Sequence, residues 1–474
     1  MNFFLISFLS ILSLASFKLI SASCHVDDET GLLAFKSGIT HDPSGMLTSW
    51  KRGTDCCTWP GISCLDANRV NSISLSGQPD KPNAFLSGTI SPLLVKLQNL
   101  DGIYFLDLRN ITGTFPDVLF RLPKLKYVYI ENNMLSGQIP TSIGNLTQLY
   151  ALSLVGNRFI GSIPSSISKL TQLNQLKLGH NFLTGEIPYG ISKIKTLNYL
   201  SLEFNKLSGP IPDFFSSFTN LRYLELSHNR FSGKIPASLS TLASKLAFLE
   251  LGFNKLSGKI PDFLGSFTIL DTLDLSWNNF SGTVPKTFGN LTKIFNLDLS
   301  HNSLKDPFPT MNVKGIESLD LSYNEFHLQQ IPNWVTSSPI IYKLGLAKCG
   351  IKLKLDDWKP KQTYFYDYID LGDNEISGSP IWLVNKTDYL IGFRASGNKL
   401  KFDLGKLRFG ERLKYLNLGR NLMYGKVPKN ITRLNSVDVS YNHLCGELPP
   451  TKFTAASFVG NDWLCGSPLA PCKL

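Results

Sequence analysis

The sequence has little charge and, beyond its first residues, no apolar run long enough to cross a membrane. Only 18% of its 474 residues are charged, whereas 43% are hydrophobic. That apolar fraction is too high for a disordered chain, and 37 Gly with 26 Pro are too few for a collagen. A membrane span needs about 18 consecutive apolar residues. We therefore expect a soluble, folded protein with no membrane span.

Motifs of common catalytic and metal sites are also missing. The sequence contains no HExxH, no Walker-type loop, no GxSxG and no zinc-spaced Cys cluster. The formal net charge of +11 comes from Lys and Arg that are scattered along the chain, which does not favour a nucleic-acid partner. We expect no enzyme, metal or cofactor.

The first 23 residues resemble a secretory signal peptide. An apolar stretch, Phe3–Phe17, is closed by Lys18, and small residues precede Cys24. An uncleaved membrane anchor is the alternative interpretation. Four of the eight Cys fall at 24–64 and three at 445–472, as expected for disulfides that stabilise short end segments in an oxidising compartment. We expect secretion to the extracellular space or cell wall, with N-glycosylation at the six sequons: Asn110, Asn145, Asn279, Asn290, Asn385 and Asn430.

A repeat of about 24 residues organises the chain. Its template, L-x-x-L-x-x-L-x-L-x-x-N-x-L-x-G-x-I-P, begins clearly at Leu122, and its Asn position holds Asn in thirteen of fourteen turns between Asn133 and Asn442. Alternating Leu has the period of a strand with one buried face, so each turn must stack on its neighbours. The Asn side chains are suited to bond the backbone where each turn leaves its strand. A parallel sheet of fourteen spacings would be on the order of 70 Å long.

This pattern is identified as the leucine-rich repeat, and its L-x-G-x-I-P ending resembles the plant-specific subclass. The resemblance implies an α/β solenoid, a right-handed superhelix of about fifteen repeats with a parallel concave sheet and disulfide caps. It further implies the pairs Cys24–Cys56, Cys57–Cys64 and Cys465–Cys472. Trp463 stands where the family usually has the partner of Cys445, which we therefore expect to be unpaired. Cys349 occupies an Asn position and is expected to be a small buried residue.

The expected organisation is a signal peptide at 1–23, an N-terminal cap at 24–96, repeats at 97–450 and a C-terminal cap at 451–474. The repeats become irregular at 305–401, where Asp306 replaces the Gly of the template and KLKLDDWKPKQTYFYDY follows Cys349. Drift in a tolerant convex loop would explain this segment. A contact site for a partner is the alternative.

Residues between the two inward Leu of each strand are predicted to project from the concave sheet. Five consecutive turns place a carboxylate there, about 5 Å from the next one. Their repulsion must be relieved by water, ions or a cationic ligand. The ordinary repeat consensus L-D-L-S is the alternative explanation for the three Asp. These five residues are Glu225, Glu250, Asp274, Asp298 and Asp320.

A line of aromatic and imidazole side chains directly precedes the Asn positions. Such a strip suits protein side chains or sugar rings. A shielded structural ladder is the alternative. Its three histidines lie two and three repeats apart, roughly 10 and 15 Å, too far for one metal ion. The line consists of His180, Phe204, His228, Phe253, Trp277, His301 and Tyr323.

The family resemblance covers residues 24–472 and extends to polygalacturonase-inhibiting proteins and the ectodomains of plant receptor-like proteins. We expect a secreted recognition protein that binds a protein or peptide through its concave face, in defence or cell-surface signalling. A receptor kinase or a microbial enzyme is the expected kind of partner. Inhibition of a microbial wall-degrading enzyme such as polygalacturonase is one alternative, although those inhibitors typically have about ten repeats. A structural wall-associated glycoprotein is another. A basic secreted plant protein would also adhere to acidic wall pectin through screened electrostatics.

Overall fold

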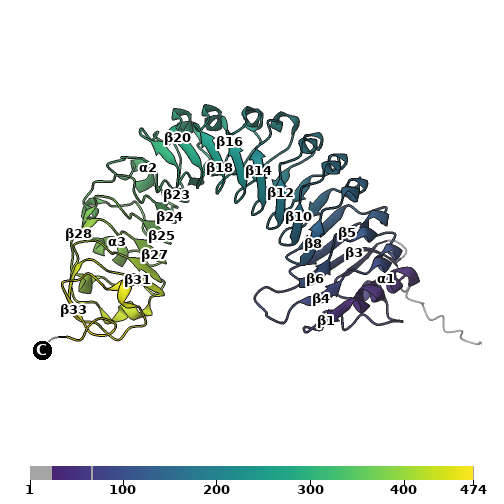
Figure 1. Ribbon diagram of the computed structural model, residues 1–474, viewed down its shortest axis with the longest axis horizontal. Coiled ribbons are helices and arrows are strands. Elements are labelled where there is room, and N and C mark those ends of the chain that lie inside the picture. Colours follow the sequence, from purple (N-terminus) through teal and green to yellow (C-terminus); the bar gives the residue numbers. More distant parts are fainter. Residues whose placement is uncertain (1–23, 66–67, 473–474) are drawn as a thin grey trace, which may run out of the picture.

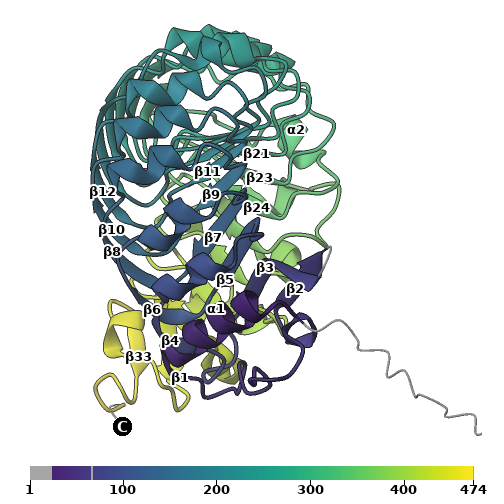
Figure 2. The same ribbon diagram turned by 90° about the vertical axis from the view of Figure 1, so that its right-hand side faces the viewer.

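The computed structural model describes residues 24–65 and 68–472. The predicted signal peptide, residues 1–23, lies outside the described residues. The chain winds through successive turns into an arch, with α1 near one end and β33 near the other (Figure 1). Seen from the side, the turns stack with their short helices aligned (Figure 2). Within the described ranges, no helix has the length and apolarity needed to cross a membrane.

A parallel sheet lines the arch. Fifteen strands from β5 to β31 pair each with the next, so the prediction of about fifteen repeats is confirmed for the described chain. Inward leucines such as Leu200 and Leu224 are fully buried and meet in register. The strands of this sheet are β2 (Ile62–Leu65), β3 (Arg69–Ser76), β5 (Gly102–Leu106), β7 (Tyr127–Glu131), β9 (Ala151–Ser153), β11 (Gln175–Lys177), β13 (Tyr199–Ser201), β15 (Tyr223–Glu225), β17 (Phe248–Glu250), β19 (Thr272–Asp274), β21 (Asn296–Asp298), β23 (Ser318–Asp320), β24 (Lys343–Gly345), β25 (Tyr368–Asp370), β27 (Gly392–Arg394), β29 (Tyr415–Asn417) and β31 (Ser436–Asp438).

A second, lateral sheet explains the L-x-G-x-I-P half of the repeat. Its glycines adopt left-handed backbone conformations, such as φ +80° at Gly233 and +83° at Gly282, which side chains disfavour. Its eleven strands run in the order β1 (Ile39–His41), β4 (Leu86–Thr89), β6 (Arg109–Gly113), β8 (Met134–Gln138), β10 (Arg158–Gly161), β12 (Phe182–Gly185), β14 (Lys206–Pro210), β16 (Arg230–Gly233), β18 (Lys255–Gly258), β20 (Asn279–Thr283) and β22 (Ser303–Lys305).

Short helices return the chain on the convex side. Most begin at the Pro of the repeat, whose fixed φ suits a helix start. The 3-10 helices are η1 (Cys56–Thr58), η3 (Pro92–Lys96), η4 (Asp117–Arg121), η5 (Thr141–Asn145), η6 (Ser165–Lys169), η7 (Tyr189–Lys193), η8 (Phe215–Ser217), η9 (Ala237–Leu242), η10 (Asp262–Ser266), η11 (Lys286–Asn290), η12 (Leu355–Asp357), η13 (Leu404–Lys406), η14 (Lys429–Arg433) and η15 (Ala455–Ser457); two α-helical turns are α2 (Asn333–Thr336) and α3 (Ile381–Asn385).

The Asn ladder bonds buried backbone as the sequence predicts. Asn181 donates through Nδ2 to the Leu154 carbonyl of the preceding turn at 2.9 Å and to the Leu178 carbonyl of its own turn at 3.2 Å. Its Oδ1 accepts from the Phe159 amide at 3.0 Å. One side chain thus satisfies backbone groups of two turns and joins them. Cys349 is fully buried at the ladder position, where its thiol lies 3.5 Å from the Leu321 carbonyl.

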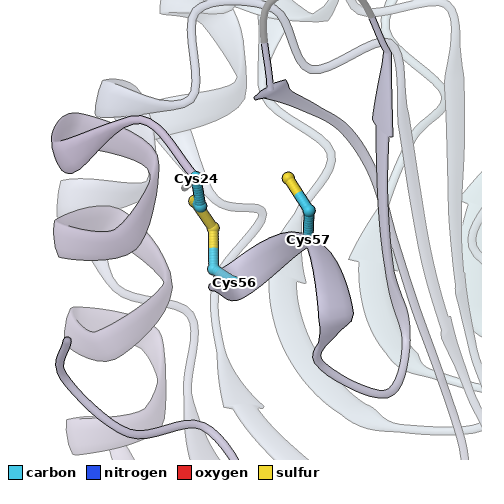
Figure 3. A group of neighbouring side chains, drawn as sticks. All are labelled: Cys24, Cys56 and Cys57. Carbon is cyan, nitrogen blue, oxygen red and sulfur yellow. A yellow bond between two sulfur atoms is a disulfide. The ribbon is translucent and has the colours of Figure 1, made fainter. Parts of the chain in front are cut away.

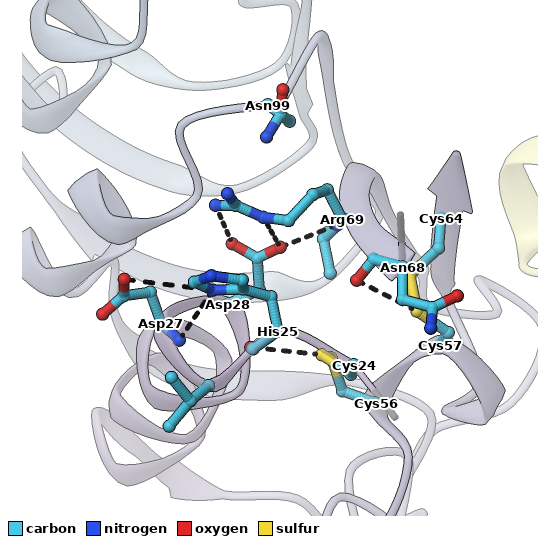
Figure 4. Close-up of polar contacts among 12 residues, drawn as sticks. Cys24, His25, Asp27, Asp28, Cys56, Cys57, Cys64, Asn68, Arg69 and Asn99 are labelled. Carbon is cyan, nitrogen blue, oxygen red and sulfur yellow. Dashed lines mark hydrogen bonds and ion pairs between the residues drawn. A yellow bond between two sulfur atoms is a disulfide. The ribbon is translucent and has the colours of Figure 1, made fainter. Parts of the chain in front are cut away.

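The N-terminal cap covers the first turn with α1 (Val26–Ser37), whose first turn is acidic and therefore favoured by the helix dipole. Asp28 of α1 is fully buried and forms two hydrogen bonds, of 2.8 and 2.9 Å, with the Arg69 guanidinium of β3 (Figure 4). It also accepts from the Val70 amide at 2.9 Å. Such a charge-assisted pair is strong, so it fixes the helix on the end of the sheet.

Disulfides close both caps with the pairing that the resemblance implies: Cys24–Cys56, Cys57–Cys64 and Cys465–Cys472. The sulfur atoms of Cys24, Cys56 and Cys57 lie within 4.8 Å of one another (Figure 3), but disulfides occupy all three, which leaves no thiolate for a metal ion. At the far end, Cys445 is unpaired and lies in register with Trp463, which is 78% exposed.

The irregular segment interrupts the lateral sheet. After β22 only isolated bridges continue the pairing, until β26 (Ser377–Gly378) joins β28 (Lys399–Leu400). The last strands are β30 (Tyr424–Gly425), β32 (His443–Glu447) and β33 (Trp463–Cys465). Asp306 and Pro307 stand where preceding turns have Gly and a pairing residue, so the regular strand ends there. The concave sheet continues without a break, because β23, β24 and β25 keep their register.

Candidate functional site

The five predicted carboxylates form one row on the concave sheet, hereafter the acidic row. Each is the third residue of its strand and lies opposite the next in register, from Glu225 through Glu250, Asp274 and Asp298 to Asp320. All five are half-buried. The row therefore concentrates negative charge along the apex of a protein with positive net charge.

Burial and mutual repulsion perturb this row. Burial, followed by the charges of Glu225 and Asp274, raises the pKa of Glu250 to about 7. Burial, followed by the charges of Asp320 and Asp274, raises the pKa of Asp298 to about 7 against the opposing effect of its Ser300 hydrogen bonds. At neutral pH each of these two carboxyls is therefore charged in some molecules and protonated in others. A nearby cation would favour the charged form.

Two kinds of carboxylate occur in the row. The Asp side chains bond their own backbone two residues on, with Asp274 accepting from the Ser276 amide at 2.8 Å and Asp298 from the Ser300 amide at 3.0 Å. This local role accounts for the L-D-L-S consensus. The Glu side chains have no such role: Glu225 accepts a hydrogen bond from the Tyr199 hydroxyl of the preceding strand. Glu225 and Glu250 are thus the members that the repeat itself does not explain.

Among the described residues, a cation forms an ion pair with the row only at its C-terminal end. Lys343 lies 3.7 Å from Asp320 at the C-terminal end, and Arg394 lies 3.9 Å from the next carboxylate of the strand series, Asp370. At the other end, Lys177 lies over the Tyr199 ring, 4.2 Å from its centroid. Among residues 24–65 and 68–472, no ion pair involves the other four carboxylates of the row, Glu225 to Asp298.

The seven aromatic and imidazole side chains form a second row, hereafter the ring row. Their rings stack continuously, with centroids 3.7–5.2 Å apart and planes within 20° of parallel. Each residue has a left-handed backbone, with φ from +50° to +55°, where Gly would be the ordinary choice. Gly156 and Gly397 occupy the same position in other turns. Lys348, Asp373 and Arg420 adopt the same conformation in other turns without a ring, so the repeat itself imposes this backbone cost of roughly 1 kcal/mol per residue, and stacking offsets it in the ring row.

Stacking decides what the ring row can contact. The rings cover each other's faces, so they present edges to the inside of the arch, although Phe204, Phe253 and Trp277 are 39–47% exposed. Sugar rings pack on aromatic faces, whereas edges suit peptide carbonyls and side chains. Burial lowers the pKa of His228 and His301, which favours neutral imidazoles within the stack.

A third row was missed at the sequence level. Tyr199, Tyr223 and Phe248 are the first residues of their strands and stack with centroids 4.8 and 4.9 Å apart. They flank the acidic row on the side opposite the ring row. The sequence does indicate the face on which this row lies, because the residue two positions before each carboxylate points to the same side of the strand. Glu225 and Glu250 therefore lie between two rows of rings, whereas Thr272, Asn296 and Ser318 hold the corresponding position beside the three Asp.

Comparisons with known proteins agree with this architecture. A family model described as "Leucine rich repeat N-terminal domain" matches residues 25–65, and "Leucine Rich Repeat" matches 124–146, 196–218, 220–242 and 270–291. The DNA damage-repair/toleration protein DRT100 of Arabidopsis thaliana is 36% identical over 27% of this chain and 37% of its own length. Polygalacturonase inhibitor 2 of the same plant is 34% identical over 22% of this chain and 34% of its own length. The chain thus spans about a third of the length of these curated relatives.

Solved structures cover more of the molecule. The plant peptide hormone receptor RGFR1, solved in complex with RGF2, matches 84% of this chain and 67% of its own with a TM-score of 0.60 and 25% identity. The Arabidopsis receptor kinase HAESA, solved with the peptide hormone IDA and the co-receptor SERK1, matches 95% of this chain and all of its own with a TM-score of 0.55; at 24% identity this likeness concerns the fold alone. The chain is a plant-type leucine-rich repeat solenoid that resembles polygalacturonase inhibitors and the ectodomains of plant receptors.

Proposed function

We propose that this protein is a secreted recognition protein that binds a protein or peptide partner through the concave face. The observation that carries the proposal is the pair Glu225 and Glu250, which forms no ion pair within the described residues and lies between two rows of rings. A partner that places Lys or Arg against Glu225 and Glu250 would relieve their repulsion. Its apolar groups would pack on the exposed ring edges on either side. No bond is made or broken in this role.

Defence or cell-surface signalling is the setting that the relatives favour. RGFR1 and HAESA are receptors whose structures contain peptide hormones, and both share the solenoid described above. By analogy, the partner of this chain is an extracellular peptide, a receptor kinase or a microbial protein. Cationic character is the chemical property that we expect such partners to share, because the concave apex is acidic.

Affinity capture from apoplastic fluid tests the proposal. The bait is the mature glycosylated chain, compared with a variant that carries Glu225→Lys and Glu250→Lys. A matched control, Glu186→Lys with Asp262→Lys, makes the same change of charge at exposed positions outside the concave strands. We expect a protein that the parent and the control retain and that the concave variant loses. Retention of every captured protein by the concave variant would show that the acidic row is not the site.

Inhibition of a microbial polygalacturonase is the second candidate function. It is favoured by the polygalacturonase inhibitors of Arabidopsis and of Vitis vinifera, which are 34–35% identical over matched segments of 111–116 residues. Such an inhibitor would use the concave face to block an active site. Titration of fungal polygalacturonases with the pure chain tests this function directly. Loss of hydrolysis at stoichiometric inhibitor, absent with the Glu225→Lys, Glu250→Lys variant, is the expected result for an inhibitor.

A further inference from the structure

An exposed surface of rings and cations lies in the irregular segment, away from the acidic row. We name it the edge patch and define it by six residues: Lys359, Tyr364, Phe365, Trp382, Tyr389 and Arg412. Tyr364 and Phe365 are 52% and 50% exposed, and Trp382 is 37% exposed. These rings cover no core, so the fold does not require them.

Each end of the edge patch pairs a cation with a ring. The Lys359 ammonium lies 3.9 Å from the centroid of the Trp382 ring, and the Arg412 guanidinium lies 4.3 Å from that of Tyr389. The Tyr364 and Tyr389 hydroxyls are 2.7 Å apart. The edge patch therefore joins side chains from three successive turns.

Segment 359–365 connects the two ends. Its Thr363 hydroxyl donates to the Lys386 carbonyl at 3.0 Å, which attaches the segment to the next turn just after α3. Trp382 and Tyr389 both lie between β25 and β27, so the two cation–ring pairs are joined through the same turn of the solenoid.

Ring orientation separates the edge patch from the ring row. The Tyr364 ring is tilted by 59° from Tyr389 and by 85° from Phe365. Among the described residues no ring stacks parallel on Tyr364 or Phe365, and both side chains are about half exposed, whereas parallel neighbours cover the faces of the ring row. Open aromatic faces pack well against the C–H faces of sugar rings.

Charge selects among sugars. Lys359 and Arg412 are the cations placed at the rings of the edge patch, both are exposed, and neither forms an ion pair with a carboxylate of the described residues. Lys and Arg are donors without acceptors, and Arg binds carboxylates in bidentate geometry. A neutral glycan would leave these cations unused, and an acidic peptide would leave the ring faces unused.

We propose that the edge patch binds an acidic, uronate-containing polysaccharide. Sugar rings lie on Tyr364 and Phe365, and uronate carboxylates accept hydrogen bonds from Lys359 and Arg412. This site is separate from the concave site of the proposed function, so one molecule can hold wall polysaccharide and a protein partner together. Adhesion to the polysaccharide would then depend on a defined surface and not on net charge alone.

Binding of polygalacturonate to the pure chain tests the proposal, with polyglutamate as a polyanion without sugar rings. All proteins carry Asn385→Gln, because that sequon lies in the same helix as Trp382. Variant one is Lys359→Glu with Arg412→Glu, and its charge-matched control is Arg158→Glu with Lys286→Glu, both exposed elsewhere. Variant two is Tyr364→Ala with Phe365→Ala, which leaves the charge unchanged.

We expect variant one to weaken polygalacturonate binding about tenfold and variant two about fivefold, with the control within about twofold of the parent. Polyglutamate should bind more weakly than polygalacturonate, and its affinity should be the same for variant two as for the parent. If variant one and its control lose the same affinity for polygalacturonate, or if variant two loses none, the binding is general electrostatic attraction and the proposal is overturned. The Glu225→Lys, Glu250→Lys variant should retain polygalacturonate, which keeps this test independent of the concave site.

Discussion

Glu250 lies directly opposite Glu225 in the parallel pairing of β15 with β17, so two carboxylates share one half-buried surface. Glu250 has a raised pKa of about 7 because burial and its acidic neighbours disfavour the charged form. A carboxyl whose folded pKa is raised stabilises the fold at low pH, and that contribution is lost as pH rises through the folded value. Folding therefore becomes less favourable between about pH 4.5 and pH 7 on account of this group.

The substitution Glu250→Gln removes this loss of stability at high pH, because Gln carries no charge. We expect the variant to have the same free energy of unfolding as the parent near pH 4 and a higher one near pH 8, by on the order of 1 kcal/mol after allowance for partial exposure. Urea unfolding at several pH values measures the difference. Glu186→Gln, at an exposed site, should leave the pH profile of the parent unchanged. A Glu250→Gln profile parallel to that of the parent would contradict the role of burial and repulsion.

The ring row offers a stability test that separates stacking from backbone strain. Phe253 stacks between His228, at 4.1 Å, and Trp277, at 5.2 Å, with φ of +52°. Phe253→Ala keeps the left-handed strain and loses both stacks, so we expect a loss of about 1–2 kcal/mol. Phe253→Gly loses the same stacks but relieves the strain, and should be more stable than the Ala variant.

Urea unfolding of both variants provides the comparison. Tyr189→Ala is a suitable control, because Tyr189 is 71% exposed and makes one edge contact, at 5.8 Å from Phe214. We expect its effect to be below about 0.5 kcal/mol. If the Ala variant at position 253 proves as stable as the Gly variant, the left-handed backbone is not strained by a side chain there.

Much of this geometry follows from periodicity alone. The Leu spacing predicts the strand positions, and the two-residue strand period places Glu225 and Glu250 on one face. The same period would also place Tyr199 and Tyr223 there, but the template treats that position as variable and gives no reason to single them out. Stacking of Trp277 on His301 depends on backbone angles that no spacing encodes.

The irregular segment shows a different limit. The replacement of the template Gly by Asp306 predicts a local interruption of the repeat, and the regular pairing of the lateral sheet does end there. The cluster of exposed rings in this segment could not be predicted, because Tyr364 and Tyr389 are 25 residues apart and meet only through the stacking of turns. Long-range pairs of this kind require the register of the whole solenoid.

The two free cysteines should differ in reactivity. Burial is the main cause of the raised pKa of the Cys349 thiol, and the side chain is fully enclosed. Cys445 is only half-buried, near the end of the solenoid. We expect a thiol-specific reagent to label Cys445 in the native protein and Cys349 only after unfolding. Native Cys445→Ser protein should therefore remain unlabelled, and native labelling at Cys349 would show that this turn opens.

Folded protein should carry glycans where the Asn side chain reaches solvent, because a chain glycosylated at an enclosed Asn would not pack there. Asn145, Asn279 and Asn290 are exposed, whereas Asn430 is half-buried and its Oδ1 atom is enclosed. A glycan is bulky and polar, so the fold accommodates it only where the amide reaches solvent. We expect glycopeptide mass spectrometry of the secreted protein to find high occupancy at the three exposed sites and low occupancy at Asn430. A fully occupied Asn430 in folded protein would mean that its turn packs differently from the arrangement described above.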